Sequence, residues 1–169
     1  MLSAIRELKL TVAVAESASG GLIAAELTRL PGSSAWFRGG LVAYDERSKV
    51  HVLGVPPALL ARYGSVSAEV ALALARAAHD LFQADIGLGE TSISGPGGAT
   101  DTKPLGLSFT ALATSTRSEV RTSHFSGSRQ ANRRAAVAVA VDLLATQASR
   151  PGTFDAGTFD ALTIAGAEC

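Results

Sequence analysis

The chain lacks the marks of a secreted, membrane-spanning or general nucleic-acid-binding protein. Its single cysteine is the last residue, Cys169, so it can form neither an intramolecular disulfide nor a cysteine metal cluster. The longest apolar runs fall well short of the roughly 20 residues that a membrane helix needs. Charged residues interrupt the N-terminal stretch where a signal peptide would lie. Fifteen basic residues balance fifteen acidic ones, whereas a nucleic-acid binder carries a basic excess. We therefore expect a cytoplasmic protein with no membrane contact and no direct nucleic-acid binding.

Aromatic residues are also scarce, at 5% of the chain. Hydrophobic residues nevertheless make up 47% and charged residues 18%, a balance that excludes a disordered chain. The 169 residues are enough for one compact domain with a substantial core. That core is expected to consist mainly of alanine, valine, leucine and isoleucine.

Apolar stretches alternate with helix start and stop signals along the chain. Strands are expected at residues 10–15, 41–44 and 86–93, followed by a strand pair at 105–113 and 119–125 that is predicted to form a hairpin. Helices are expected at 22–30, 45–53, 57–63, 68–82 and 129–147, with Ser67 and Ser128 as caps of the last two. This order predicts an α/β fold, a single layered domain with a mixed β-sheet flanked by helices. We assign the domain to residues 1–149 and a flexible or loosely docked tail to 150–169.

The turn after the first expected strand, residues 16–21, is the first candidate site. A serine at a strand-to-helix turn, here Ser17, lies where ligands usually bind in open α/β sheets. Gly20 and Gly21 let backbone N–H groups approach an anion, and the following helix start adds positive potential. The alternative is that Ser17 or Ser19 caps that helix, which the spacing alone favours.

A second candidate site, residues 44–49, follows the second expected strand. Tyr44 and Lys49 are therefore expected at the same edge of the sheet as Ser17. A serine hydroxyl is a poor nucleophile until a base removes its proton, and a lysine with a lowered pKa can be that base. In the alternative interpretation Lys49 is a solvated surface residue and Tyr44 only packs.

A glycine-rich loop at residues 94–99 and a pair of arginines form the third candidate site. The loop follows an apolar strand, and its N–H groups suit a phosphate or carboxylate, although an ordinary turn has the same pattern. Arg129 and Arg133 are four residues apart near a helix start, so they share a face that can clamp a phosphate. The alternative for the arginines is a solvated basic face that includes Arg134.

The order of these segments resembles one known family, the CinA C-terminal domain family of nicotinamide mononucleotide deamidases. The similarity covers about residues 10–145. Residues 15–21 are similar to its A-E-S-C-T-G-G, 94–98 to its A-G-P-G-G, 103–106 to its K-P-V-G, and 125–133 to its F-x-G-D-R-x-x-x-R. Residues 30–37 and 39–44, with Lys49 after them, resemble the segments between the first two of these motifs.

The resemblance implies a serine–lysine amidohydrolase that converts nicotinamide mononucleotide to nicotinic acid mononucleotide and ammonia, without a metal or cofactor. Ser17 would be the nucleophile and Lys49 its base, while Tyr44 would assist proton transfer or orient the pair. N–H groups near Ser19 to Gly21 would stabilise the oxyanion. The substrate-binding residues implied are Ser19, Gly20, Gly21, Gly95, Gly97, Gly98 and Arg129. The resemblance also implies a homo-oligomer, most simply a dimer.

Some positions depart from the family pattern. The family's cysteine and threonine are Ala18 and Ser19, a glycine before the loop is Ser92, and Glu90 falls in a stretch that the family keeps apolar. A carboxylate buried at Glu90 either needs a partner or becomes protonated, and near the site it can also disturb the pKa of Lys49.

These departures support a second hypothesis, a catalytically impaired homologue that binds a nucleotide or a protein partner in competence or DNA-damage responses. A third, a metal-dependent phosphoryl-binding hydrolase, lacks clustered ligands, because His51, His79 and His124 are scattered.

Overall fold

The computed structural model describes residues 7–148, and these form a five-stranded sheet with the strand order β2-β1-β3-β4-β5. The strands are β1 (Val12–Glu16), β2 (Phe37–Val42), β3 (Ile86–Ser92), β4 (Leu107–Ala113) and β5 (Ser118–His124). Strand β1 runs parallel to β2 and β3, while β3–β4 and β4–β5 are antiparallel. The predicted mixed sheet and its hairpin are confirmed. The predicted tail and Cys169 lie outside the described residues, so the boundary at 149 stays a prediction.

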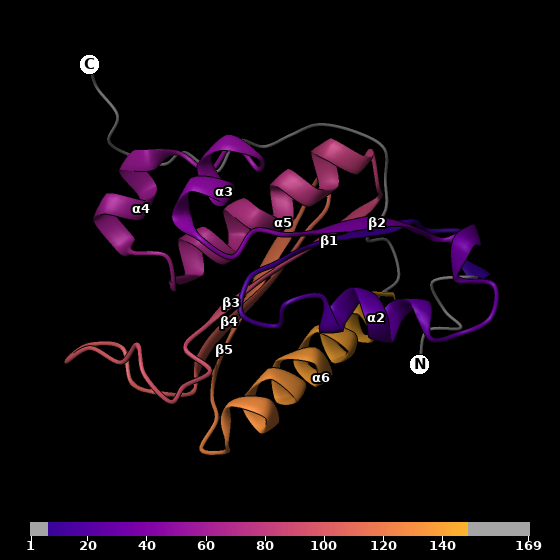
Figure 1. The fold of residues 1–169 in the computed structure, drawn as a ribbon. Coiled ribbons are helices and arrows are strands. Elements are labelled where there is room, and N and C mark those ends of the chain that lie inside the picture. Colours follow the sequence, from indigo (N-terminus) through magenta and orange to yellow (C-terminus); the bar gives the residue numbers. More distant parts are fainter. Residues whose placement is uncertain (1–6, 149–169) are drawn as a thin grey trace.

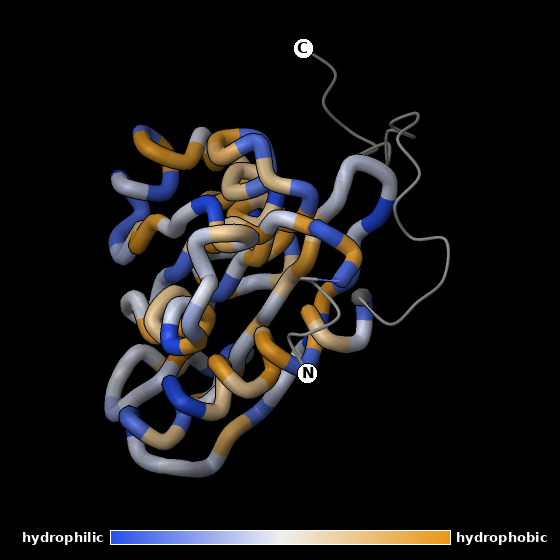
Figure 2. The backbone as a smooth tube through the Cα atoms, turned by 90° about the vertical axis from the view of Figure 1, so that its right-hand side faces the viewer, coloured by the Kyte–Doolittle hydropathy of each residue, from blue (hydrophilic) through white to orange (hydrophobic). Residues whose placement is uncertain are grey.

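Helices cover both faces of the sheet, as Figure 1 shows. On one face lie α2 (Leu22–Thr28) and α6 (Arg129–Ala148). On the other lie α3 (Glu46–His51), α4 (Pro57–Tyr63) and α5 (Ala68–Phe82), while the short 3-10 turn η1 (Ser33–Ala35) leads into β2. The predicted layers are thus confirmed. No helix within residues 7–148 is long and apolar enough to span a membrane, and Figure 2 shows hydrophilic segments interrupting the hydrophobic ones along the tube.

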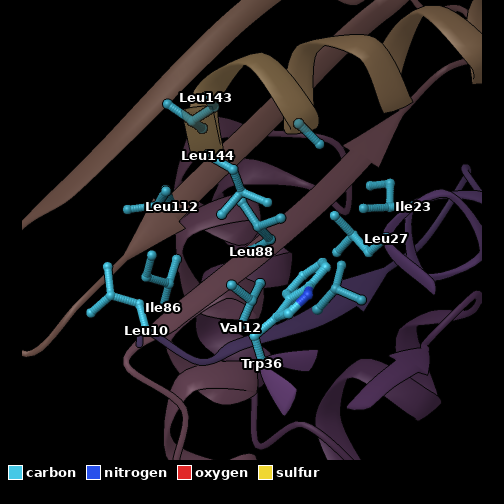
Figure 3. Close-up of a cluster of buried hydrophobic side chains, with 12 residues drawn as sticks. Leu10, Val12, Ile23, Leu27, Trp36, Ile86, Leu88, Leu112, Leu143 and Leu144 are labelled. Carbon is cyan, nitrogen blue, oxygen red and sulfur yellow. The ribbon is translucent and has the colours of Figure 1, made fainter. Parts of the chain in front are cut away.

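One hydrophobic core lies between the sheet and the helices α2 and α6 (Figure 3). It combines side chains from the strands with side chains from both helices, namely Val12, Val14, Ile86, Leu88, Leu112, Ile23, Leu27, Leu143 and Leu144. A second cluster on the opposite face joins β1 to α5 and the α3–α4 region through Ala15, Leu53, Leu60, Val70 and Leu74. The sheet is therefore buried on both sides, and only its edges and strand ends remain for a site.

Helix α5 lies unusually close to β3 because two glycines face it. A Cβ atom on Gly87 would lie 2.0 Å from the Ala75 carbonyl oxygen, and one on Gly89 would lie 2.1 Å from the Ala71 carbonyl oxygen. Small alanines therefore form the contact face of the helix. Leu81 lies outside this face, because it is 56% exposed and lines a surface pocket with Val52 and Ala77.

The second strand differs from the sequence prediction, since β2 begins at Phe37 and already ends at Val42. Gly39 and Gly40, which precede the predicted strand at 41–44, lie within β2 and pair with Ala13 and Val14. A Cβ on Gly40 would come within 2.7 Å of Val14 Cγ1, so the close approach of β1 explains the glycine.

Candidate active site

The candidate segments converge at one edge of the sheet. Because β1, β2 and β3 are parallel, their carboxyl ends share an edge. Ser17 follows β1, Tyr44 comes just after β2, and the loop at 94–98 follows β3. The first turn of α6 joins them, since Arg129 donates hydrogen bonds to Gly95 and Tyr44. The structure therefore brings together the segments that the sequence singled out.

Ser17 and Lys49 are in direct contact in the interior of this edge. The Lys49 Nζ atom lies 3.1 Å from Ser17 Oγ and donates a second hydrogen bond, at 3.3 Å, to the Tyr44 carbonyl oxygen. Lys49 is 1% exposed and Ser17 7% exposed. Helix α3 places the lysine, and Asp45 caps that helix by accepting from the Ser48 N–H at 2.7 Å. The alternative of a solvated Lys49 is excluded, and the geometry is that of a nucleophile beside a base.

Burial lowers the pKa of Lys49 from its ordinary value. The carboxylates of Glu46, Glu90 and Asp45 act in the opposite direction but do not cancel the effect of burial. Among the described residues none of these carboxylates forms an ion pair with Lys49. A larger fraction of Lys49 is therefore in the neutral amine form than in a solvated lysine, and this form can accept a proton from Ser17.

Tyr44 contacts Lys49 through its backbone and not through its hydroxyl. Its side chain is 57% exposed, and its hydroxyl oxygen accepts a hydrogen bond from Arg129 Nη2 at 2.6 Å. Arg129 Nη1 donates to the Gly95 carbonyl oxygen at 2.6 Å. Tyr44 thus orients Lys49 with its carbonyl group, while its hydroxyl ties the β2 edge to α6.

The two arginines predicted to form one clamp have different partners. Arg133 Nε donates to the Ala18 carbonyl oxygen at 2.9 Å, and its Nη2 donates to the Ser19 carbonyl oxygen at 2.7 Å. Arg129, one helical turn earlier, points to Tyr44 and Gly95. Arg133 therefore supports the turn that carries Ser17, and only Arg129 lies at the glycine-rich loop.

A carboxylate from the end of β1, missed by the sequence reasoning, caps helix α2. Glu16 is 1% exposed; its Oε2 accepts from the N–H groups of Gly21 and Ile23, at 2.9 and 3.1 Å, and its Oε1 accepts from Ala24 at 2.8 Å. The N-cap residue is Gly21, which has a φ of 93° and no side chain to cap with. The alternative in which Ser17 or Ser19 caps this helix is therefore wrong.

Glu90 is a second buried carboxylate at the same turn. It is 0% exposed, and its Oε2 accepts from the Ser19 N–H at 2.9 Å, the Ser19 hydroxyl at 2.7 Å and the Ser17 N–H at 3.3 Å. Its Oε1 is buried without a hydrogen-bond partner among the described residues. The expectation that a carboxylate here needs a partner is confirmed.

The N–H groups expected to stabilise an oxyanion are already occupied. The Ser19 N–H donates to Glu90, the Gly20 N–H to the Ser17 carbonyl oxygen and the Gly21 N–H to Glu16. This expectation is corrected, because a donor held by a carboxylate is not available to a substrate oxygen. Within this turn the Ala18 N–H makes no hydrogen bond to another described residue.

The glycine-rich loop is anchored at its start and exposed beyond it. Asn132, also missed by the sequence reasoning, donates to the Ser94 carbonyl oxygen at 3.2 Å and accepts from the Gly127 N–H at 2.9 Å. Gly97 and Gly98 are exposed, and their N–H groups make no hydrogen bond within residues 7–148. In the same range no cluster of three His, Cys, Asp or Glu side chains could hold a metal ion.

Comparison with known proteins agrees with this arrangement. The family model of the CinA C-terminal domain matches residues 1–148. A CinA-like protein from Geobacter sulfurreducens is 47% identical over 139 residues, which are 82% of this chain and 34% of that protein. The chain thus spans about a third of the length of this curated relative.

Solved structures give the same result. The competence/damage inducible protein CihA from Agrobacterium tumefaciens is 34% identical with a TM-score of 0.83, over 86% of this chain and 89% of that one. A CinA superfamily protein from Escherichia coli is 27% identical with a TM-score of 0.81, over 85% and 83% of the two chains. Sequence and structure together show that the chain belongs to the CinA C-terminal domain family.

Proposed function

We propose that the chain is an amidohydrolase that converts nicotinamide mononucleotide to nicotinic acid mononucleotide and ammonia by a serine–lysine mechanism. One observation carries the proposal, the buried contact of 3.1 Å between Lys49 Nζ and Ser17 Oγ. Nucleophilic catalysis by serine requires a base within hydrogen-bonding distance, and burial lowers the pKa of this lysine toward the working range of a base.

In this mechanism neutral Lys49 accepts the Ser17 proton while Ser17 Oγ bonds to the carboxamide carbon of the substrate. The carbonyl oxygen becomes an oxyanion, for which the Ala18 N–H, directly after the nucleophile, is the proposed donor. Protonated Lys49 then gives its proton to the leaving nitrogen, and ammonia departs as the C–N bond breaks. Water next attacks the acyl–Ser17 ester, Lys49 takes a proton from the water, and that proton returns to Ser17 Oγ.

The exposed N–H groups of Gly97 and Gly98, together with Arg129, are the proposed contacts for the phosphate and ribose. A glycine-rich loop with unoccupied N–H groups suits a phosphate. Arg129 keeps guanidinium N–H groups beyond the two that bind Gly95 and Tyr44, so it can still donate to a phosphate oxygen.

The test is ammonia release from nicotinamide mononucleotide, with and without a chelator, by the native chain, Ser17→Ala and Lys49→Ala. We expect chelator-resistant release that falls by roughly a thousandfold or more in both variants, because the two groups act as one unit. Lys9→Ala, an exposed lysine, is the matched control and should retain native activity. No release from the folded native chain would refute the assignment for this substrate.

Glu90 favours a second candidate function, a binding protein with impaired turnover. Its carboxylate holds the N–H groups of Ser17 and Ser19, next to the nucleophile. The competence/damage name of the Agrobacterium relative suggests the setting for such a protein. Calorimetric binding of nicotinamide mononucleotide without ammonia release would favour this candidate, whereas turnover would exclude it.

A further inference from the structure

Glu90 lies directly beneath the turn that carries the nucleophile. The last paired residues of β1 and β3 are Ala15 and Gly89. Glu90 is therefore the first residue of β3 beyond its pairing with β1. Its Oε2 accepts hydrogen bonds from both ends of the Ser17–Ser19 segment, and its Oε1 has no hydrogen-bond partner within residues 7–148. A buried carboxylate with one free oxygen is costly, which points to a role at this position.

We infer that Glu90 is a positioning residue for the Ser17–Lys49 pair, which fixes the Ser17–Ser19 turn from inside the sheet and places a negative charge near the lysine. The inference rests on the proposed function, because the proposed function assigns Ser17 and Lys49 their roles as nucleophile and base. The sequence alone shows only an acidic residue in an apolar stretch.

The positioning follows from the contacts of the turn. Arg133 holds the carbonyl oxygens of Ala18 and Ser19 from the side of α6. Glu90 holds the N–H groups of Ser17 and Ser19 from the side of β3. The backbone on both sides of Ala18 is therefore fixed by two charged side chains. This keeps Ser17 Oγ at Lys49 and leaves the Ala18 N–H outside the network.

The second part of the role is electrostatic. Three carboxylates act on Lys49; Asp45 and Glu46 belong to its own helix region, and Glu90 alone comes from the sheet. Arg129 and Arg133 of α6 approach the same turn, and the titratable hydroxyl of Tyr44 lies on Arg129. A fully buried charge is screened less by salt than an exposed one. Glu90 thus holds the pKa of Lys49 above the value that burial alone would give it.

The experiment uses the full chain, which contains only three lysines, Lys9, Lys49 and Lys103. Labelling the lysine side chains with 13C makes the Lys49 titration readable by NMR without turnover. In Glu90→Gln, the side-chain carbonyl oxygen can take the position of Oε2 and remain an acceptor, while the NH2 group takes the position of Oε1. This substitution removes the charge and retains the turn contacts, whereas Glu90→Val removes both. Glu26→Gln, on the surface of α2, is the control for the lost charge.

We expect the Lys49 titration midpoint to be lower in Glu90→Gln than in the native chain, because a negative charge near the ammonium is gone. Amide exchange at Ser19 should stay near the native rate in this variant. In Glu90→Val we expect Ser19 exchange about tenfold faster or more, since its acceptor is lost. Glu26→Gln should change neither quantity.

An unchanged Lys49 midpoint in Glu90→Gln would overturn the inference, and so would native Ser19 exchange in a folded Glu90→Val. If Glu90→Val does not fold, the Glu90→Gln titration decides alone. Neither readout needs turnover, so failure of the proposed function would appear separately, as absent ammonia release. With turnover present, the rising limb of the rate against pH should move to lower pH in Glu90→Gln, in parallel with the titration.

Discussion

The cap that Glu16 forms on α2 can be tested by two substitutions of different severity. Its carboxylate accepts three backbone N–H groups, two on Oε2 and one on Oε1. Glu16→Ala removes all three acceptors in a site that is almost closed to solvent. In Glu16→Gln, the amide oxygen can keep the two N–H groups of Gly21 and Ile23. The amide nitrogen then faces the Ala24 N–H, a donor against a donor.

The contacts set the expected size of each effect. Hydrogen bonds to a charged group contribute about 1.5–3 kcal/mol each, but partly exposed N–H groups regain water when the acceptor is lost. We therefore expect Glu16→Ala to lower the free energy of unfolding by about 3 kcal/mol. Glu16→Gln loses one bond and the favourable interaction of a negative charge with a helix start, about 1–2 kcal/mol in all.

Urea unfolding followed by circular dichroism measures both values, with the slope m as a check that the unfolded state is unchanged. Glu26→Gln removes a negative charge from the same helix, where Glu26 only pairs with exposed Arg29, and should leave the stability close to native. A loss below about 1 kcal/mol in Glu16→Ala would refute the assigned cap. Equal losses in Ala and Gln would show that hydrogen-bond number does not determine the effect.

Four further predictions concern the lysine, the sheet, the arginine and the assembly. Lys49→Met should abolish ammonia release. Because folding lowers the pKa of Lys49, the free energy of unfolding of the native chain should rise with pH between the pKa of the folded state and that of the unfolded state, about 10.4. Urea unfolding at several pH values should show that the variant lacks this rise. Gly89→Ala should cost about 3 kcal/mol or more in urea unfolding, through its clash with α5, whereas Gly97→Ala, with open space around it, should not. Arg129→Ala should raise KM for nicotinamide mononucleotide more than it lowers kcat, by steady-state kinetics. The homodimer implied by the family resemblance should appear as twice the chain mass in light scattering, and a monomeric mass would reject it.

Local signals in the sequence were enough for most of the fold. The predicted helix at 57–63 is confirmed as α4, which begins at Pro57 and is followed by Gly64. The predicted cap at Ser67 is also confirmed, since its hydroxyl accepts from the Val70 N–H at 3.3 Å. Ser128 likewise accepts from the Ala131 N–H at the start of α6. Each of these features depends on residues within four positions of one another, so the sequence contains the whole interaction.

Features that depend on distant segments could not be predicted in this way. Glu16 caps α2 although five residues separate it from the helix. Helix caps are predicted from sequence by a Ser, Thr, Asp or Asn directly before the helix, so this cap was missed. Arg129 and Arg133 are four residues apart on one helix, but Arg129 donates to Gly95 in the loop after β3, whereas Arg133 donates to Ala18 in the turn after β1. The burial of Lys49 likewise depends on how β1 and β2 place their following segments, and a lone lysine in a sequence does not reveal it.

The arginines and the buried carboxylates at the site do not pair with one another. Among the described residues, neither Arg129 nor Arg133 forms an ion pair; both arginines donate to carbonyl oxygens, and Arg129 also donates to the Tyr44 hydroxyl. The buried carboxylates of Glu16 and Glu90 accept mainly backbone N–H groups, so they do not neutralise these cations by direct contact. Cations that hold a turn without carboxylate partners keep their field available to an anionic ligand. For the proposed reaction, this favours the phosphorylated substrate over the corresponding nucleoside, which lacks the phosphate and carries only the positive charge of its pyridinium ring.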